Sequence, residues 1–303
     1  MAGASSDLRR YPMTVVIATL GGGSLKGTIE AINRGTIVPD EILICIPVKE
    51  AHRAHDFPCS NVKVLVTDCR GQVAQRAIGF QNASYEVVMQ LDDDMLVDEQ
   101  CIAYLLKTLS MHGPKAAVAP SLINVLTGES IYKKPERNKI LEKLYYWFMN
   151  GSAGYQEGKI EKSGSAVGVD PGRGNKESYD VEWLPGGCVM HFKNNLVLEN
   201  YYPFEGKAYC EDIIHSYYLK SRGVNLIVDS GALCALEVIS ASSYGPKEFL
   251  RDLVADFHAR KFFLQLCVRN SIRIYFFYFE SCLSYVFKKV NRFRIFGERG
   301  TKS

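Results

Sequence analysis

The stretch EVVMQLDDDML, residues 86–96, runs from a short apolar segment directly into three adjacent aspartates. Its apolar part, bounded by polar residues, has the length and composition of a buried β-strand. Three neighbouring carboxylates repel one another, and burying them is costly unless a cation or hydrogen-bond donors meet them. The stretch therefore predicts a strand that ends either in a solvated turn or in a site for a positively charged ligand.

Segments on both sides of this stretch alternate between strand and helix patterns. Apolar runs predict strands at 13–19, 41–47, 62–67, 85–91 and 224–230, and amphipathic spacing predicts helices at 25–34, 71–83, 99–111 and 211–222. This order is typical of an α/β fold with a mostly parallel twisted sheet flanked by helices, as in Rossmann-like domains. Such sheets bind ligands beyond the carboxyl ends of their strands, where Thr19, Asp68 and the three aspartates lie.

The spacing of the aspartates suits a metal ion. Residues two apart on a strand point to the same side, so Asp92 and Asp94 aim together while Asp93 points away. Mg²⁺ or Mn²⁺ needs only one or two protein carboxylates in addition to substrate phosphates. Helix capping is the alternative, but Asp98 is better placed to cap the helix that begins near Glu99. We therefore expect a divalent cation at Asp92 and Asp94, with Asp93 and Asp94 as the alternative pair.

Two blocks of the chain resemble family 2 glycosyltransferases of the GT-A fold. The first is RGQVAQRAIGFQNASYEVVMQLDDDMLVDEQCIAYLLKTL, a helix followed by a strand that ends in a D-x-D signature. The second is YDVEWLPGGCVMHFKNNLVLENYYPFEGKAYCEDIIHSYYLKSRGVNLIVDSGAL, which is similar to the family's W-x-x-G-G segment, Glu-Asp pair and final strand. The resemblance implies a GT-A domain over 11–240, with a nucleotide-sugar-binding half at 11–120 and an acceptor half at 121–240.

The activity that the resemblance implies is inverting, hexosyltransferase-type transfer of a sugar from a nucleotide-diphosphate donor to an acceptor hydroxyl. A divalent cation would neutralise charge on the departing diphosphate. Asp212 matches the family's general base, and Glu211 matches the acid before it. Read without the resemblance, this pair could merely complement a helix dipole. The implied acceptor is a lipid-linked or surface glycan, as in polysaccharide biosynthesis.

Further residues match the donor side of the family's site. Arg76 matches a helix arginine that faces the nucleotide, with a surface ion pair as the alternative. Asp92 and Asp93 join Thr19 at the donor. Trp183, Gly186 and Gly187 would form a floor under the sugar, with a flat ring and backbone that can approach closely. A buried core tryptophan beside a turn is the alternative for Trp183.

Two segments depart from the family pattern. The second strand ends in ILICIPVKEAH, without the acidic pair that usually holds the nucleotide base, so we expect Asp68 to contribute there. The segment SGALCALEVIS lacks the usual metal-binding histidine. Glu237 lies near that position and is the expected substitute as a metal ligand.

Two regions differ in composition from the rest. Residues 151–180 are rich in Gly, Ser and charge, which predicts a mobile loop or a poorly ordered insertion. Residues 245–303 are predicted to form a helical, aromatic extension, and 258–303 carry ten Lys/Arg against two Glu. This composition is typical of an interfacial helix on an anionic membrane. A helix hairpin packed on the catalytic domain is the alternative, and no nucleic-acid-binding motif accompanies the tail.

The cysteine pattern and the distribution of apolar residues bear on the cellular compartment of the protein. The nine cysteines are dispersed without a C-x-x-C pair, which argues against a disulfide framework or a structural zinc site and favours a reducing compartment. The N-terminus lacks an apolar secretory segment, and no run of eighteen apolar residues occurs. We therefore expect a cytoplasmic protein, peripheral at the inner face of the cell membrane.

Two other functions are compatible with parts of this pattern. A sugar nucleotidyltransferase shares the sheet and the acidic metal site, but it would carry a basic phosphate loop after the first strand, where LGGGSLKGT offers only Lys26. A catalytically degenerate, membrane-associated scaffold would explain the two departures from the family pattern. The intact D-x-D and Glu-Asp pairs count against the scaffold.

Overall fold

The structure is a computed structural model that describes residues 12–54, 57–134, 138–173, 176–238, 245–270 and 272–300, with side chains in the last range described to 289. The chain divides into two compact units. Unit 1 comprises 1–134, 157–159 and 168–237, and unit 2 comprises 135–156, 160–167 and 238–303. The expected domain limits at 11 and 240 lie outside the described residues.

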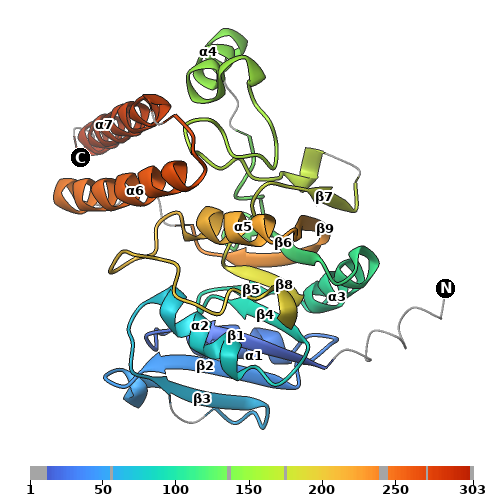
Figure 1. Cartoon of the computed structure of the whole chain (residues 1–303). Helices are drawn as coiled ribbons and strands as arrows, with labels where there is room; N and C mark the ends of the chain where they lie inside the picture. Colours follow the sequence, from blue (N-terminus) through green and yellow to red (C-terminus); the bar gives the residue numbers. More distant parts are fainter. Residues whose placement is uncertain are drawn as a thin grey trace. The chain divides into compact units, whose positions relative to one another are not determined.

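The described part of unit 1 is built on a nine-stranded sheet with the order β3-β2-β1-β4-β8-β6-β9-β5, and β7 also pairs with β9 (Figure 1). The strands are β1 (Met13–Ala18), β2 (Glu41–Pro47), β3 (Val62–Thr67), β4 (Val87–Leu91), β5 (Leu96–Val97), β6 (Ala116–Asn124), β7 (Ser178–Asp180), β8 (Cys188–Phe192) and β9 (Asn225–Leu236). The predicted α/β class, a sheet flanked by helices with the GT-A fold and a helical C-terminal region, is confirmed.

Helices cover both faces of this sheet. They are α1 (Leu25–Asn33), α2 (Gln72–Asn82), α3 (Cys101–His112) and α5 (Glu211–Ser221). Apolar side chains of α1 and α3 pack with alternate residues of the central strands in one core cluster. Phe80 of α2 and Leu219 of α5 pack with the intervening residues of those strands, on the opposite face. Burial on both faces explains why β1, β2 and β4 read as continuous apolar runs.

The sheet is parallel only in part. The pairs β1–β2, β2–β3 and β1–β4 are parallel, as is β6–β9, whereas β8 runs antiparallel between β4 and β6. The parallel half corresponds to the helical crossovers that the sequence predicts. The antiparallel β8 follows the Trp-x-x-Gly-Gly segment and brings it beside the end of β4.

Strand register determines which loop residues meet. Ile17 of β1 and Cys188 of β8 both pair with Leu91, the last residue of β4. The backbone N–H of Asp92 then donates to the carbonyl of Gly187 at 2.8 Å. The three aspartates therefore begin between the end of β1 and the start of β8.

Unit 2 is helical. It contains α4 (Lys139–Asn150), α6 (Pro246–Leu266) and α7 (Ile272–Gly300), and α7 packs against both of the others. The predicted helical extension is thus present, but α4 is a helix that the sequence analysis did not assign. Because α4 packs on α7, the structure groups 135–156 with the C-terminal helices rather than with the GT-A domain.

The Gly- and Ser-rich region 151–180 has local structure where it is described. It contains the 3-10 turns η3 (Gly151–Ala153) and η4 (Pro171–Arg173) and strand β7, and its residues are divided between the two units. Its mobility stays a prediction. Two further 3-10 turns, η2 (Ala51–Arg53) and η5 (Lys193–Asn195), lie in unit 1. All nine cysteines are free. Within the described ranges, no helix has the length and apolar character needed to cross a membrane.

Candidate active site

The centre of the site is a buried arginine between two acids. Arg76 on α2 is 2% exposed, and its Nη2 donates to Asp92 Oδ1 at 3.0 Å while its Nη1 donates to Glu211 Oε1 at 2.9 Å. Burial alone would lower the pKa of Arg76, but the charges of Glu211 and Asp92 outweigh it and raise this pKa above its usual value. Arg76 therefore joins the D-x-D strand end to the Glu-Asp helix start. The surface ion pair considered for it is wrong.

The ionised form of Asp92 is disfavoured in spite of this arginine. Its Oδ1 also accepts a hydrogen bond from Gln72 Nε2 at 2.7 Å. Burial raises the pKa of Asp92 to about 6, with further contributions from the nearby charges of Glu211 and Asp94, while Arg76 acts in the opposite direction. A carboxylate in this state is stabilised by an additional cation.

Asp93 is held by the turn that follows β1. Its Oδ2 accepts a hydrogen bond from the Thr19 hydroxyl, which itself accepts from the Gly21 N–H at 2.8 Å. The backbone carbonyl of Asp93 accepts from the Thr28 hydroxyl at 2.9 Å. Thr19 and Asp93 therefore fix the Gly-rich turn against the end of β4, which is where the sequence analysis placed the donor.

Asp94 is the exposed member of the three aspartates. Burial of part of its carboxyl raises its pKa, the charge of Asp93 raises it further, and Lys207 opposes the shift. Lys207 lies in the segment before α5 and did not stand out in the sequence. An exposed carboxylate beside a second acid and a lysine is an arrangement that suits an incoming cation with phosphate.

The donor set fits a divalent cation that arrives with a diphosphate. Asp92 and Asp94 would supply the one or two protein carboxylates with which Mg²⁺ or Mn²⁺ is bound in such sites. Among the described residues no group of three or more His, Cys, Asp or Glu side chains could hold a metal. Glu237 is exposed, and β5 pairs with β9 so that Leu96 lies opposite Ala235. Extending that register by two residues would place Glu237 across from Asp94, and its role as a third ligand stays a prediction.

The Glu-Asp pair begins α5. Glu211 is buried, and its Oε1 accepts from the Tyr201 hydroxyl as well as from Arg76. Asp212 is partly exposed, and its Oδ1 accepts from the N–H of Ile213 at 2.8 Å. The pair is thus divided into a buried acid that binds the arginine and a more accessible acid at the helix N-terminus.

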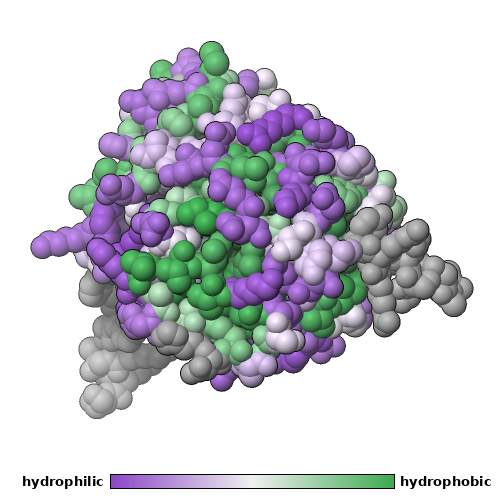
Figure 2. Space-filling view, turned by 60° about the horizontal axis from the view of Figure 1, so that its bottom comes forward, coloured by the Kyte–Doolittle hydropathy of each residue, from purple (hydrophilic) through white to green (hydrophobic). Residues whose placement is uncertain are grey.

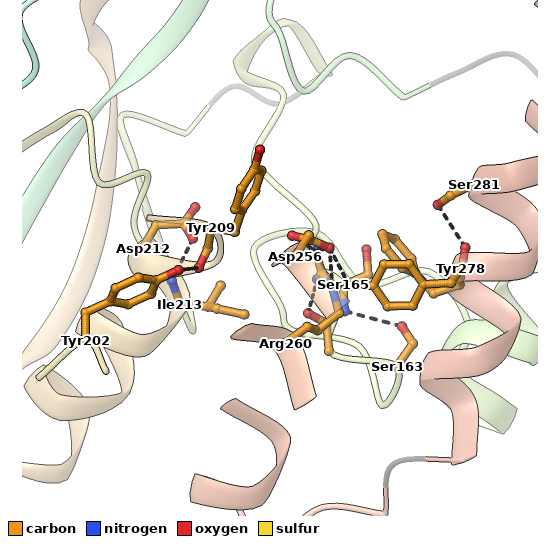
Figure 3. Close-up of polar contacts among 12 residues, drawn as sticks. Ser163, Ser165, Tyr202, Tyr209, Asp212, Ile213, Asp256, Arg260, Tyr278 and Ser281 are labelled. Atoms are coloured by element: carbon orange, nitrogen blue, oxygen red, sulfur yellow. Dashed lines mark hydrogen bonds and ion pairs between the residues drawn. The ribbon is translucent and has the colours of Figure 1, made fainter. Parts of the chain in front are cut away.

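The segment before Asp212 is fixed by a tyrosine. The Tyr202 hydroxyl donates to the carbonyl of Tyr209 at 2.9 Å, and Figure 3 shows this contact next to Asp212 and Ile213. Cys210, the residue before the helix, has a left-handed backbone with φ of 55°. This conformation is uncommon for a residue other than glycine. The start of α5 is therefore held in one defined geometry, as a positioned base requires.

The two glycines of the Trp-x-x-Gly-Gly segment let the backbone approach Glu211 and Asp92 closely. A Cβ at Gly186 would lie 2.8 Å from Glu211 Oε2, and one at Gly187 would lie 2.9 Å from Met95 Cε and 3.4 Å from Asp92 Oδ2. The carbonyl of Gly186 accepts from Gln90 Nε2 at 2.7 Å, which holds the segment on β4.

Two residues expected at the donor lie elsewhere in unit 1. Trp183 is 4% exposed, and its ring meets Tyr132 edge to face with centroids 5.6 Å apart. This burial favours the core alternative over a ring that stacks on a sugar. Asp68 is exposed just after β3 and has no charged partner within ion-pair distance among the described residues. Its contact with a nucleotide base stays a prediction.

Several supporting residues were not identified from the sequence. Gln75 Nε2 donates to the carbonyls of Thr19 and Cys45, which joins the ends of β1 and β2. Tyr201 stacks on His215 with ring centroids 5.7 Å apart. Burial lowers the pKa of His215 to about 3, and the charge of Arg76 lowers it further, so this ring is neutral. Gln75 lies on the same helix as Arg76, and His215 lies one turn after Glu211, but residue type alone did not distinguish either from an ordinary core residue.

The sheet order, the acidic strand end and the helices on both faces define a GT-A type α/β domain. Residues 48–171 match the family model described as glycosyl transferase family 2. Together with the fold, this match supports a likeness to family 2 of the glycosyltransferases, and the matched part is less than half of the chain. No curated protein sequence matches the chain significantly.

Two solved structures resemble the chain. One is a crystal structure of GalNAc-T7 with UDP, GalNAc and Mn²⁺, with a TM-score of 0.54 and 18% identity over 82% of this chain and 48% of that one. The other is the mannosyltransferase PcManGT from Pyrobaculum calidifontis in complex with GDP-Man and Mn²⁺, with a TM-score of 0.51 and 13% identity over 86% of this chain and 65% of that one. At these identities the likeness shows a shared fold. The chain spans about half the length of the first structure and 65% of the second.

Proposed function

We propose that the chain is a metal-assisted, inverting, hexosyltransferase-type glycosyltransferase that uses a nucleotide-diphosphate sugar. The observation that carries the proposal is Arg76, which is buried between Asp92 and Glu211 and brings the donor block and the acceptor block of the sequence into one cluster. Two relatives in fold contain Mn²⁺ together with UDP or GDP-Man, which is consistent with such a donor.

The reaction places different demands on the two acidic groups. Asp92 and Asp94 would hold a divalent cation, which supplies Lewis-acid stabilisation of the diphosphate leaving group. Asp212 would accept the proton of the acceptor hydroxyl as its oxygen forms a bond to the anomeric carbon. The bond from that carbon to the diphosphate breaks, and its electron pair leaves with the diphosphate. Attack opposite the leaving group inverts the anomeric configuration.

Glu211 and Arg76 would position these groups. Arg76 and Gln72 each donate one hydrogen bond to Asp92 Oδ1, which would leave Oδ2 for a cation. Glu211 is occupied by Arg76 and the Tyr201 hydroxyl, which makes it a neighbour that orients the helix start rather than a second base. Thr19, Asp93 and the backbone of Gly186 and Gly187 would complete the donor side.

The proposed acceptor is a lipid-linked or surface glycan. A lipid-linked or surface glycan follows from the resemblance, and such an acceptor is presented at a membrane. Contact with the inner face of the cell membrane is therefore part of the same proposal, and unit 2 supplies the structural argument for it below.

Thermal unfolding with nucleotides tests the donor site. We expect one of UDP, GDP, dTDP and CMP to raise the melting temperature only when Mn²⁺ is present, because a ligand that binds the native state stabilises it by mass action. At a ligand concentration of 100 times the Kd the gain is about 2.7 kcal/mol. Asp94→Ala should lose this gain, whereas Asp180→Ala, an exposed aspartate of β7, should keep it.

The same variants separate donor binding from chemistry. Asp212→Asn should keep the metal-dependent stabilisation by the nucleotide but lose transfer to an acceptor by about 10²–10⁴-fold, the usual contribution of a positioned base. No stabilisation across the panel, or equal stabilisation of Asp94→Ala and wild type, would remove the proposed donor site.

A further inference from the structure

One face of α7 is a continuous row of exposed apolar side chains. Its members recur every three or four residues, as one side of a helix requires, and they are Ile272, Tyr275, Phe276, Phe279, Leu283, Val286 and Phe287. Phe279 is 65% exposed and Phe287 is 66% exposed. Large apolar side chains at this exposure are costly in water when they are contiguous.

A second row lies on α4. Ile140, Leu141, Leu144 and Trp147 are exposed on one side of this helix, and Ile140 is 77% exposed. Tyr146 and Met149, on the other side, are buried. This helix is therefore amphipathic with its apolar side outward, the reverse of the usual orientation in a soluble domain.

The two rows belong to one body, because α4 packs directly on α7. The rings of Phe148 and Phe276 are 4.9 Å apart. Arg273 Nη1 donates to the carbonyls of Trp147 and Phe148 at 2.7 and 2.6 Å, and its guanidinium lies 5.7 Å from the centroid of the Trp147 ring. The arginine thus fixes the C-terminal end of α4 against the first turn of α7. We call the exposed rows of α4 and α7, together with Arg273, the α4–α7 surface.

The outward orientation of α7 is fixed by its other face. Ile274 and Tyr278 are buried, and the Tyr278 hydroxyl donates to Asp256 of α6. Arg260 of α6 binds Asp256 through Nη2 at 3.0 Å and donates to the carbonyl of Gly164 at 2.6 Å. Figure 3 shows Asp256, Arg260 and Tyr278 pointing toward one another between the two helices. A polar network of this kind specifies one rotation of α7, so the apolar row cannot turn inward without breaking it.

The charges around these rows are mainly positive. Through residue 289, α4 and α7 carry Lys139, Lys143, Arg273, Lys288 and Lys289 against Glu142 and Glu280. Lys139 and Lys143 are exposed beside the apolar row of α4, and Lys288 is exposed near the far end of α7. The sequence that follows, 290–303, adds four Lys/Arg against one Glu.

Exposed apolar residues alone do not identify an interface. Unit 1 also exposes Val48, Val64 and Val66 around its edge strand β3. Figure 2 shows hydrophobic residues in separate patches among hydrophilic ones on the face it displays. Scattered residues of this type are normal on soluble proteins. The α4–α7 surface differs because its apolar residues are large and aromatic, lie in two rows, and are flanked by cations.

We infer that the α4–α7 surface docks unit 2 onto a lipid bilayer that contains anionic lipids, with α4 and α7 lying in the plane of the interface. The apolar rows would enter the boundary between headgroups and acyl chains, while the lysines would contact anionic headgroups. Within the described residues, neither helix could cross the bilayer. This inference deepens the membrane part of the proposed function but does not depend on sugar transfer, because its residues lie outside the candidate active site.

Tryptophan fluorescence tests this docking directly. The chain has two tryptophans, of which Trp183 is buried and Trp147 lies on the α4–α7 surface with 53% exposure. Adding vesicles of equimolar phosphatidylcholine and phosphatidylglycerol should shift the emission of the full chain to shorter wavelength, and vesicles of phosphatidylcholine alone should shift it much less. Trp147→Phe should abolish the shift, which would assign it to α4.

Substitutions with matched controls measure the two contributions to binding. Phe279→Ser with Leu283→Ser should lower the vesicle partition coefficient by tenfold or more, whereas Val64→Ser with Val66→Ser on β3 should leave it unchanged. Lys139→Gln with Lys143→Gln should lower it by about thirtyfold, from about 1 kcal/mol for each cation near an anionic surface. Each variant is first checked for wild-type circular dichroism and for nucleotide-dependent stabilisation, which the α4–α7 substitutions should not change.

Three results would overturn the inference. The first is equal binding to both kinds of vesicle, and the second is unchanged binding in the variant with Phe279→Ser and Leu283→Ser. The third is a dimer that shields Trp147 from solvent and does not bind vesicles. The third would assign the surface to a second copy of the chain. If wild-type protein binds vesicles but no nucleotide stabilises it, the proposed function is contradicted and the inference about the α4–α7 surface still holds.

Discussion

The two units differ in which side chains they bury and which they expose. Unit 1 holds a charged cluster in which Arg76 and Glu211 are buried and Asp92 is partly buried. Unit 2 places large apolar residues such as Phe279 and Ile140 outward and a buried polar network inward. Both arrangements cost free energy in water. The difference teaches that each unit is completed by a different partner, in our proposals a cation with a nucleotide for unit 1 and a bilayer for unit 2.

The largest effect is expected at the charged cluster. Arg76→Met keeps much of the side-chain volume but leaves the buried Glu211 and the partly buried Asp92 without their cation. Removing one partner from a buried ion pair costs about 3–5 kcal/mol. Urea unfolding at neutral pH should show a loss of this size for unit 1, accompanied by loss of nucleotide-dependent stabilisation.

An exposed arginine in the same unit is the control. Arg70 lies 3.6 Å from Glu50 with its side chain 67% exposed. Arg70→Met should change stability by less than about 1 kcal/mol, since exposed ion pairs contribute little. Equal losses in the two variants would mean that the Arg76 cluster is not the buried, tightly paired group described above.

The next effect is expected at a buried acid of unit 2. Glu161 is 1% exposed, its Oε1 has no hydrogen-bond partner in the described part of the chain, and burial raises its pKa to about 7. The folded state therefore holds this proton more tightly than the unfolded chain, and stability from Glu161 is lost as pH rises from about 4.5 to about 7. Glu161→Gln should be more stable than wild type above pH 7, by about 3 kcal/mol, and equal to it below about pH 4.5.

The measurement is the difference in unfolding free energy between variant and wild type across this pH window. Glu99→Gln, at an exposed glutamate of unit 1, should give a difference near zero at every pH. A Glu161→Gln difference that does not grow with pH would show that this carboxyl ionises freely in the folded protein. The contrast with unit 1, where Arg76 compensates buried acids, would then be lost.

Much of unit 1 could be predicted from the sequence because its signals are local. Apolar runs located β1, β2, β3 and β4, and amphipathic spacing located the helices between them. The aspartates and the Glu-Asp pair were found because acidic residues at strand and helix ends are unusual. Arg76 binds both Asp92 and Glu211, although Arg76 and Glu211 are 135 residues apart in the sequence. No local sequence pattern indicates a contact over that separation.

The features that the sequence did not predict depend on tertiary packing. Trp183 was expected at the sugar because its motif suggested it, but Tyr132 and the core cover the ring. Helix α4 was not assigned from the sequence, and apolar residues lie on both its exposed side (Ile140, Leu144) and its buried side (Tyr146, Met149). The tail was correctly predicted as helical, but its contacts with α4, among them Arg273 with the α4 backbone and Phe276 with Phe148, became visible only in the structure.

The smallest of these effects is expected from one methyl group in unit 1. Gly186→Ala would place a Cβ 2.8 Å from Glu211 Oε2, so the backbone or the carboxylate must shift. Overpacking of this kind costs about 1–3 kcal/mol. Because Glu211 binds Arg76, the shift should also weaken the metal-dependent stabilisation by nucleotide, measured as a change in melting temperature. Gly245→Ala in unit 2, where a Cβ would meet only Glu248 Oε2 at 3.7 Å, is the control and should leave the metal-dependent stabilisation by nucleotide unchanged. If Gly186→Ala behaves like Gly245→Ala, the cluster has freedom to move, and the contrast between a tightly specified unit 1 and an outward-facing unit 2 is weaker than the geometry indicates.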